Sequence, residues 1–245
     1  MFTQQQLDTT INSFKNWFRT SIIAPHIQNT RKLVHLNAFK VNPFLPIYLS
    51  NYLSGTSDAQ EIAKALVYPR VLGTSITTTF GTAMQKFVTE FFSGVAGSTT
   101  PGIDIEFIDQ IDNRRKYCQL KSGPDSLNYD DVTTIKNHFL SLIRLAHTNH
   151  LDVRHEDMLF CITYGEESEL NSFIRQLRDQ YVVYAGRDFW FHFTGDNSFY
   201  DKLINAAGEV AREVNSSQVV QEVITALAHE IEEAGWNRPP EQPQA

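Results

Sequence analysis

The chain has 245 residues, of which 42% are hydrophobic, and a formal net charge of −7. These values fit a globular protein with a sizeable core. No apolar run approaches the roughly 18 residues of a membrane span, and the first residues show neither a basic stretch nor an apolar stretch of a secretory signal. We therefore expect no membrane association.

The two cysteines, Cys118 and Cys161, stand among apolar residues and form no CxxC pair. This pattern excludes a zinc framework and indicates a reducing, cytoplasmic setting. Acidic residues concentrate after Gly208, whereas a basic cluster stands at Arg114-Arg115-Lys116. Because nucleic-acid binding depends on local basic surface, the overall charge neither supports nor excludes a DNA-binding protein.

Helical periodicity predicts a helical N-terminal third. The first expected helix is 3–22, and Pro25 ends it. The second is about 30–53, with an interruption at Asn42-Pro43. The third is 57–67, and Pro69 ends it. Residues 70–82 (RVLGTSITTTFGT) are rich in Gly, Ser and Thr. They are either a turn-rich connector or a set of hydroxyls and amides that contact DNA phosphates. The apolar positions of 80–95 then predict a core helix, and 94–102 a flexible link.

Residues 102–122 (GIDIEFIDQIDNRRKYCQLKS) predict a β-hairpin with a polar turn. Strand side chains alternate between faces, so Asp104 and Glu106 share one face, as do Gln119 and Lys121. If Ile103, Ile105, Cys118 and Leu120 point into the core, an acid, an amide and a lysine gather on the opposite side. Such a grouping is unusual for a core hairpin.

The remaining pattern alternates helices and strands. We expect a helix capped by Asn128 or Asp130, a buried strand at 158–164, a helix at 167–180, strands at 182–184 and 189–193, and helices at 198–214 and 218–234. The fold class is therefore α/β, a mixed sheet flanked by helices, with additional N- and C-terminal helices. We predict one domain, 1–235, in which 1–65 form a possible helical subdomain, and a disordered tail at 236–245.

Asp104, the hairpin and Gln119-Leu120-Lys121 resemble the signature of the PD-(D/E)XK nuclease superfamily. Two flanking segments, Tyr68–Gly81 and Leu120-Lys-Ser-Gly-Pro124 with Asn128 opening a helix, are similar to type II restriction endonucleases, in particular to a subgroup that cuts interrupted GG…CC palindromes. The resemblance covers about residues 40–165. It implies a restriction-endonuclease-like core and a prokaryotic enzyme that cuts double-stranded DNA as a homodimer with Mg²⁺. Two departures are Pro101, three residues before Asp104, and Gln119, which stands where an acid is usual.

The resemblance also implies roles for individual residues. Asp104, the Gln119 amide oxygen and the Leu120 carbonyl would be Mg²⁺ ligands, and Lys121 would face the phosphate. Whether Lys121 is a general base, whether Glu106 takes part and how many metal ions bind stay open. Glu90, on the preceding helix, is either a holder of metal-bound water or a surface charge. Candidate DNA contacts are Arg70, Ser75, Thr77, Ser122, Asn128 and Arg187.

Other readings compete with this one. A lone Asp and a QxK on strands are usually edge and surface residues, and Arg187 is more readily a hairpin-turn residue. His138, His147, His150 and His155 have no acid or cysteine at metal spacing, so we interpret them as surface or core residues. No GxGxxG, P-loop or GxSxG is present. Two alternative functions are a repair or junction-resolving nuclease of the superfamily and an inactive DNA-binding protein that keeps the fold.

Overall fold

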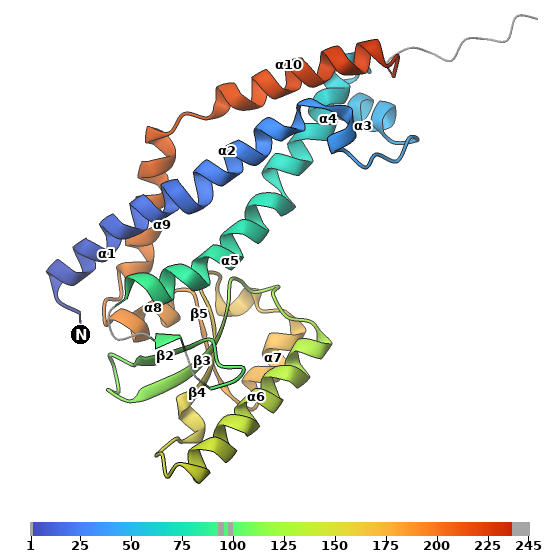
Figure 1. Cartoon of the computed structure of the whole chain (residues 1–245). Coiled ribbons are helices and arrows are strands. Elements are labelled where there is room, and N and C mark those ends of the chain that lie inside the picture. Colours follow the sequence, from blue (N-terminus) through green and yellow to red (C-terminus); the bar gives the residue numbers. More distant parts are fainter. Residues whose placement is uncertain (1, 93–95, 98–99, 237–245) are drawn as a thin grey trace, which may run out of the picture. The chain divides into compact units, whose positions relative to one another are not determined.

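A mixed β-sheet organises the part of the chain that carries the hairpin (Figure 1). Its strands are β1 (Ala96–Gly97), β2 (Ile105–Ile108), β3 (Arg115–Lys121), β4 (Met158–Ile162) and β5 (Val182–Ala185), adjacent in that order. β1, β2 and β3 pair antiparallel, whereas β3, β4 and β5 pair parallel. The computed structural model describes residues 2–92, 96–97 and 100–236, with all their side chains except those of residues 74, 75, 91, 96 and 97. The predicted hairpin and mixed α/β sheet are confirmed.

Helices cover both faces of this sheet. α6 (Tyr129–Thr148) and α7 (Ser172–Arg178) pack on one face, where Phe139 and Ile174 share a core with Phe160 of β4. α8 (Arg187–Thr194) lies against the other face, where the ring of Phe193 is 4.9 Å from that of Phe107. Parallel strands buried on both faces read as continuous apolar runs, as β4 does.

Residues 189–193 form part of α8, so the predicted strand there is wrong. Gly186, with φ of +43°, turns the chain directly before the helix. Phe189, Trp190 and Phe193 are buried at positions i, i+1 and i+4, which is the spacing of one helix face. A short run of aromatic residues is compatible with both the period of a strand and the period of a helix, which is why the sequence pattern predicted a strand here.

Prolines do not end the N-terminal helices where predicted. α1 (Gln4–Trp17) continues through a π-helix, Phe18–Ile23, into α2 (Ala24–Arg31), and Pro25 occupies the first turn of α2. That position needs no backbone N–H donor. α4 (Ala59–Leu72), capped by Asp58, contains Pro69 three residues before its end. The predicted ends at Pro25 and Pro69 are therefore wrong.

The segment 70–82 is helical rather than a turn-rich connector. Arg70 to Leu72 complete α4, and after Gly73 the chain enters α5 (Thr74–Phe91). Upstream, the predicted helix 30–53 is divided into 3₁₀ turns at Lys32–Val34 and Leu36–Ala38 and α3 (Pro46–Ser54), which ends at Gly55. Ring contacts of Phe14 and Trp17 with Phe87, at 5.3 and 4.9 Å, join α1 to α5.

The chain divides into two units, Met1–Phe18 with Phe80–Val210, and Arg19–Thr79 with Ala211–Ala245. The first holds the sheet. The second is helical, and its core joins α4 to α10 (Ser217–Glu233) through residues such as Ile62 and Leu227. It overlaps the predicted subdomain 1–65 without sharing its bounds. α9 (Phe199–Glu213) and α10 confirm the last two predicted helices. The tail 237–245 and part of the 94–102 link lie outside the described residues.

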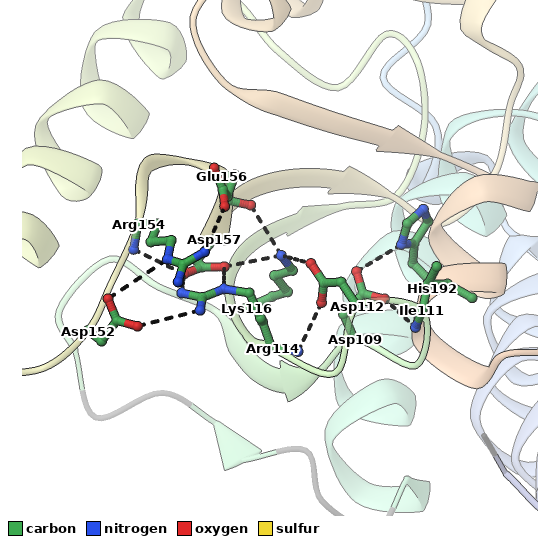
Figure 2. Close-up of polar contacts among 10 residues, drawn as sticks. All are labelled: Asp109, Ile111, Asp112, Arg114, Lys116, Asp152, Arg154, Glu156, Asp157 and His192. Carbon is green, nitrogen blue, oxygen red and sulfur yellow. Dashed lines mark hydrogen bonds and ion pairs between the residues drawn. The ribbon is translucent and has the colours of Figure 1, made fainter.

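A buried ionic network anchors the turn of the β2–β3 hairpin (Figure 2). The ammonium of Lys116, 2% exposed, lies 2.6 Å from Asp112 and 3.1 Å from Asp157, which is 1% exposed. Arg114 donates two hydrogen bonds to Asp157, of 3.0 and 2.5 Å. Because Asp157 directly precedes β4, the network ties the hairpin turn to the neighbouring strand.

The same part of the fold pairs all three residues of the basic cluster Arg114-Arg115-Lys116 with acidic side chains. Lys116 and Arg114 are bound to Asp157, and Arg115 pairs with Glu106 at 3.1 Å. Next to this network, His192 lies 2.8 Å from the buried Asp109 (Figure 2). Within the described residues, no helix is long and apolar enough to cross a membrane.

Candidate active site

Asp104 lies directly before β2, at the edge where β2 leaves β3. Its N–H donates to the Cys118 carbonyl at 3.0 Å, and its carboxylate accepts the N–H of Leu120 at 2.8 Å. Ile105 pairs with Cys118 in the ladder, so the pairing extends one residue beyond the strand. The hairpin itself thus holds the Asp104 carboxylate against the middle of the predicted Gln119-Leu120-Lys121 motif.

The Asp104 carboxylate is held in a partly dehydrated setting although the residue keeps exposed surface. Burial raises its pKa, and the Leu120 N–H, Lys121 and His138 offset only part of that rise. A carboxylate that has lost water without gaining an ion pair favours a cation close by. The electrostatics therefore suit cation binding at Asp104.

Gln119 is buried on the sheet face that α6 covers, rather than on an open polar face. Its amide nitrogen donates to the Gly102 carbonyl and lies 2.6 Å from Nδ1 of His138. The amide oxygen accepts no hydrogen bond from another described residue. Anchoring through nitrogen leaves that oxygen available as a neutral ligand.

His138, which sequence reasoning treated as a surface or core residue, belongs to this site. It follows Ile135 by three residues on α6, so it projects toward the sheet beside the buried stripe. Gly102 has φ of +83°, and a β-carbon there would collide with the imidazole of His138. Its helical position next to Ile135 and Phe139 is the signal that could have revealed it.

Lys121 ends β3 and is half-buried. Its charge is close enough to Asp104 to lower the pKa of that carboxyl. The Leu120 carbonyl accepts a 2.5 Å hydrogen bond from Gln85 of α5. A carbonyl oxygen has two lone pairs, so this contact leaves one for another ligand. Asp104, Gln119 and Lys121 are therefore brought together on one hairpin, as the sequence predicts.

The comparison with known families shows what kind of protein carries this hairpin. The model of the type II restriction endonuclease EcoO109I family matches residues 15–215, which include the whole hairpin, α6 and β5. The chain belongs to this family. It is accordingly a type II restriction endonuclease, a site-specific deoxyribonuclease that binds double-stranded DNA. No curated protein sequence matches the chain.

Several residues predicted to serve this restriction endonuclease are engaged elsewhere. Arg187 pairs with Asp201 through two hydrogen bonds of 2.7 Å each, which gives it a structural role. Asn128 caps α6 by accepting the N–H of Asp131. Glu90 is exposed on α5 and forms no hydrogen bond or ion pair with another described residue.

The other candidate DNA contacts divide between the two units. Ser122 directly follows β3, and its carbonyl accepts the N–H groups of Thr163 and Tyr164. Arg70, Ser75 and Thr77 belong to the helical unit. Arg70 is exposed at the end of α4, Thr77 donates to the Gly73 carbonyl at 3.1 Å, and the side chain of Ser75 lies outside the described part.

The donor set fits a hard cation that brings most of its own ligands. Within the described residues, no group of three His, Cys, Asp or Glu side chains could hold a metal ion. The hairpin offers one carboxylate, one amide oxygen and one backbone carbonyl. Mg²⁺ takes oxygen ligands and commonly keeps several waters beside one or two protein carboxylates, so the residues present suit it better than zinc or calcium.

Proposed function

We propose that this restriction endonuclease uses Mg²⁺ at Asp104, Gln119 and Leu120, and cuts a short palindrome as a homodimer. The observation that carries the proposal is the convergence of Asp104 and Lys121 on the Gln119 strand in a chain of this family. Two-fold symmetric DNA is most simply cut by a two-fold symmetric protein. The resemblance of Tyr68–Gly81 and Leu120–Pro124 favours an interrupted GG…CC sequence as the site.

Asp104 supplies the anionic ligand, and the Gln119 and Leu120 oxygens supply neutral ones. A Mg²⁺ ion bound there would act as a Lewis acid that neutralises charge on the phosphate and makes water more acidic. Lys121 orients the attacking water or stabilises charge that develops on the phosphate. Because Gln119 adds no negative charge, we expect a single metal ion held more weakly than in a site with two carboxylates.

Digestion of unmethylated phage DNA tests this function. In Mg²⁺ we expect discrete fragments whose sequenced ends define one palindrome, and in EDTA no cutting. Nicking that follows DNA structure rather than sequence would select the repair or junction-resolving nuclease. Binding of DNA without cutting in either Mg²⁺ or Mn²⁺ would select an inactive protein that keeps the fold.

Replacing His138 by alanine tests whether the imidazole positions Gln119. Loss of the 2.6 Å contact frees the Gln119 amide to turn, so we expect the Mg²⁺ concentration for half-maximal cleavage to rise about 10-fold. Metal-supported DNA binding in Ca²⁺, measured by gel shift, should weaken in parallel. The rate at saturating Mg²⁺ should change much less.

The matched variant His138→Gln keeps an acceptor for the Gln119 amide and should recover most of the metal affinity. His147 is an exposed residue nine positions after His138 on α6. His147→Ala should therefore change neither the Mg²⁺ dependence of cleavage nor DNA binding in Ca²⁺. A lower melting temperature with unchanged Mg²⁺ dependence would show that His138 is only a packing residue beside Gly102.

A further inference from the structure

Helix α3 presents most of its apolar residues to solvent and buries Pro46 and Ser50. Ser50 is fully buried, at 0% exposure, and α3 packs on α4. The exposed apolar residues of α3, together with Phe44 in the turn before it, define the α3 face, which consists of Phe44, Ile47, Tyr48, Leu49, Tyr52 and Leu53. A surface helix of a globular protein normally buries its apolar stripe and exposes its polar one. In α3 the apolar residues are instead exposed, alongside the polar Asn51 and Ser54.

The exposure is large for a monomer surface. Phe44 is 87% exposed and Tyr52 is 81% exposed, and the rings of Tyr48 and Tyr52 lie 6.1 Å apart along the helix. Taken together, the six residues expose on the order of 700 Å². Contiguous apolar surface of this size marks an interaction site. It is close to the roughly 800 Å² that each partner contributes to a standard-size interface.

The chemistry of the face discriminates among occupants. Residues 41–57 contain no charged side chain, although 20% of the chain is charged. DNA requires lysine or arginine against its phosphates, and membrane-surface helices are rich in the same residues. In a contact with two-fold symmetry, a surface patch packs against the same patch of the second copy. A charged residue near the symmetry axis would therefore lie close to an identical charge, which is unfavourable. A neutral patch rich in tyrosine and phenylalanine is what such a contact tolerates.

We propose that the α3 face is the surface through which two copies of this chain associate. A groove of about 520 Å³ beside the face is lined mainly by apolar residues such as Phe39, Leu45 and Leu49, and also by Lys40 and Arg70. It offers a recess for a projecting side chain of the second copy. The inference rests on the proposed homodimer, and it assigns the contact between the two copies to α3.

The first test compares masses in solution by size exclusion with light scattering. Wild type should have twice the 28.0 kDa of one chain. Tyr48→Glu combined with Tyr52→Glu should raise the dimer dissociation constant roughly 100-fold or more, because each charge is buried twice in a symmetric contact. Ile204→Glu, at a 55% exposed position on α9, is the matched control and should leave the dimer intact.

A second test locates the contact without changing its charge. Cys118 and Cys161 are both 0% exposed, so a single Tyr52→Cys substitution introduces one accessible thiol. Its alkylation should be slow at concentrations where the protein is dimeric and fast after dilution to monomers. A thiol that stays reactive in the dimer, or a dimer lost in Ile204→Glu, would overturn the assignment to α3.

Other outcomes separate this inference from the proposed function. A monomeric wild type that cuts DNA overturns the α3 contact and leaves the nuclease. A dimer that protects residue 52 but cuts nothing overturns the nuclease and leaves the contact. If the glutamate variants unfold at lower temperature while wild type is a monomer, the face is covered by this chain itself and the inference fails.

Discussion

Replacing Lys121 by alanine is expected to reduce Mg²⁺-dependent cleavage roughly 100-fold or more, without weakening DNA binding to the same degree. The reason is that Lys121 is the cation beside Asp104 at the end of β3, where the proposed mechanism has charge develop on the phosphate. The measurement is the single-turnover rate on a plasmid that carries one site, at saturating Mg²⁺. Binding is measured separately by gel shift in Ca²⁺.

Lys136→Ala is the matched control for Lys121, because Lys136 is a half-buried lysine on α6 outside the hairpin. It should cut at close to the wild-type rate. Asp104→Asn should resemble Lys121→Ala in rate but lose metal-supported DNA binding as well, since it removes the one carboxylate of the donor set. Cutting by Lys121→Ala at the wild-type rate would mean that the active site lies elsewhere in the chain.

Removing the carboxylate of Asp157 is expected to have the largest effect on stability. Asp157→Ala leaves the ammonium of Lys116, 2% exposed, with Asp112 as its remaining ion-pair partner among the described residues. It also leaves Arg114 with the longer, 3.4 Å contact to Asp152. Breaking a buried ion pair from one side costs about 3–5 kcal/mol. The free energy of unfolding, measured by urea denaturation at pH 7, should fall by about that amount.

Glu156→Ala is the matched control for Asp157. Glu156 is the exposed neighbour, and its carboxylate is 3.5 Å from Arg154, so its removal should change the free energy of unfolding by less than about 0.5 kcal/mol. Equal effects of the two substitutions would show that the network in Figure 2 contributes nothing specific. An unchanged stability of Asp157→Ala would show that Lys116 finds water or another partner.

The same network predicts how stability depends on acid. Burial alone would raise the pKa of Asp157, but hydrogen bonds from Arg114, the Arg154 N–H and Lys116 outweigh it and lower the pKa to about 2, from 3.8 in the unfolded chain. A carboxyl with a lowered pKa stabilises the folded state fully above its unfolded pKa and loses that contribution as pH falls. The contribution is about 2 kcal/mol and should disappear between about pH 4 and pH 2.

This acid dependence is measured by comparing wild type with Asp157→Ala in urea across that pH range. The difference between their free energies of unfolding should shrink by about 2 kcal/mol as the pH falls from 4 to 2. A difference that stays constant would mean that Asp157 titrates alike in the folded and unfolded chains.

Local patterns were sufficient to predict the hairpin and the grouping of its polar residues. Asp104, Gln119 and Lys121 follow one another within two short strands, and the alternation of strand side chains brings them together without any distant contact. The flanking motif of Leu120–Pro124 lies in the same stretch, so the family could be inferred from contiguous residues. The last two helices, with long amphipathic stripes, were also predicted correctly.

Short or locally ambiguous segments were predicted less well. The five residues 189–193 fit a strand and a helix equally, and packing of Phe193 on Phe107 selects the helix. Pro25 and Pro69 end helices by local rule, but the chain accommodates both within helical runs. For residues 189–193 the packing of the aromatic rings therefore outweighs the local preference, whereas Pro25 fits the first turn of α2.

The sequence by itself therefore determined the mixed α/β class, the β-hairpin that carries Asp104 and Lys121, and the restriction-endonuclease family, because each depends on residues close together in the chain. Only the tertiary structure showed that His138 contacts Gln119 and that Arg114 and Lys116 form ion pairs with Asp157. It also showed that most apolar residues of α3 are exposed. Periodicity predicts that a helix has an apolar face. Whether that face is buried or exposed depends on how the helix packs against the rest of the chain.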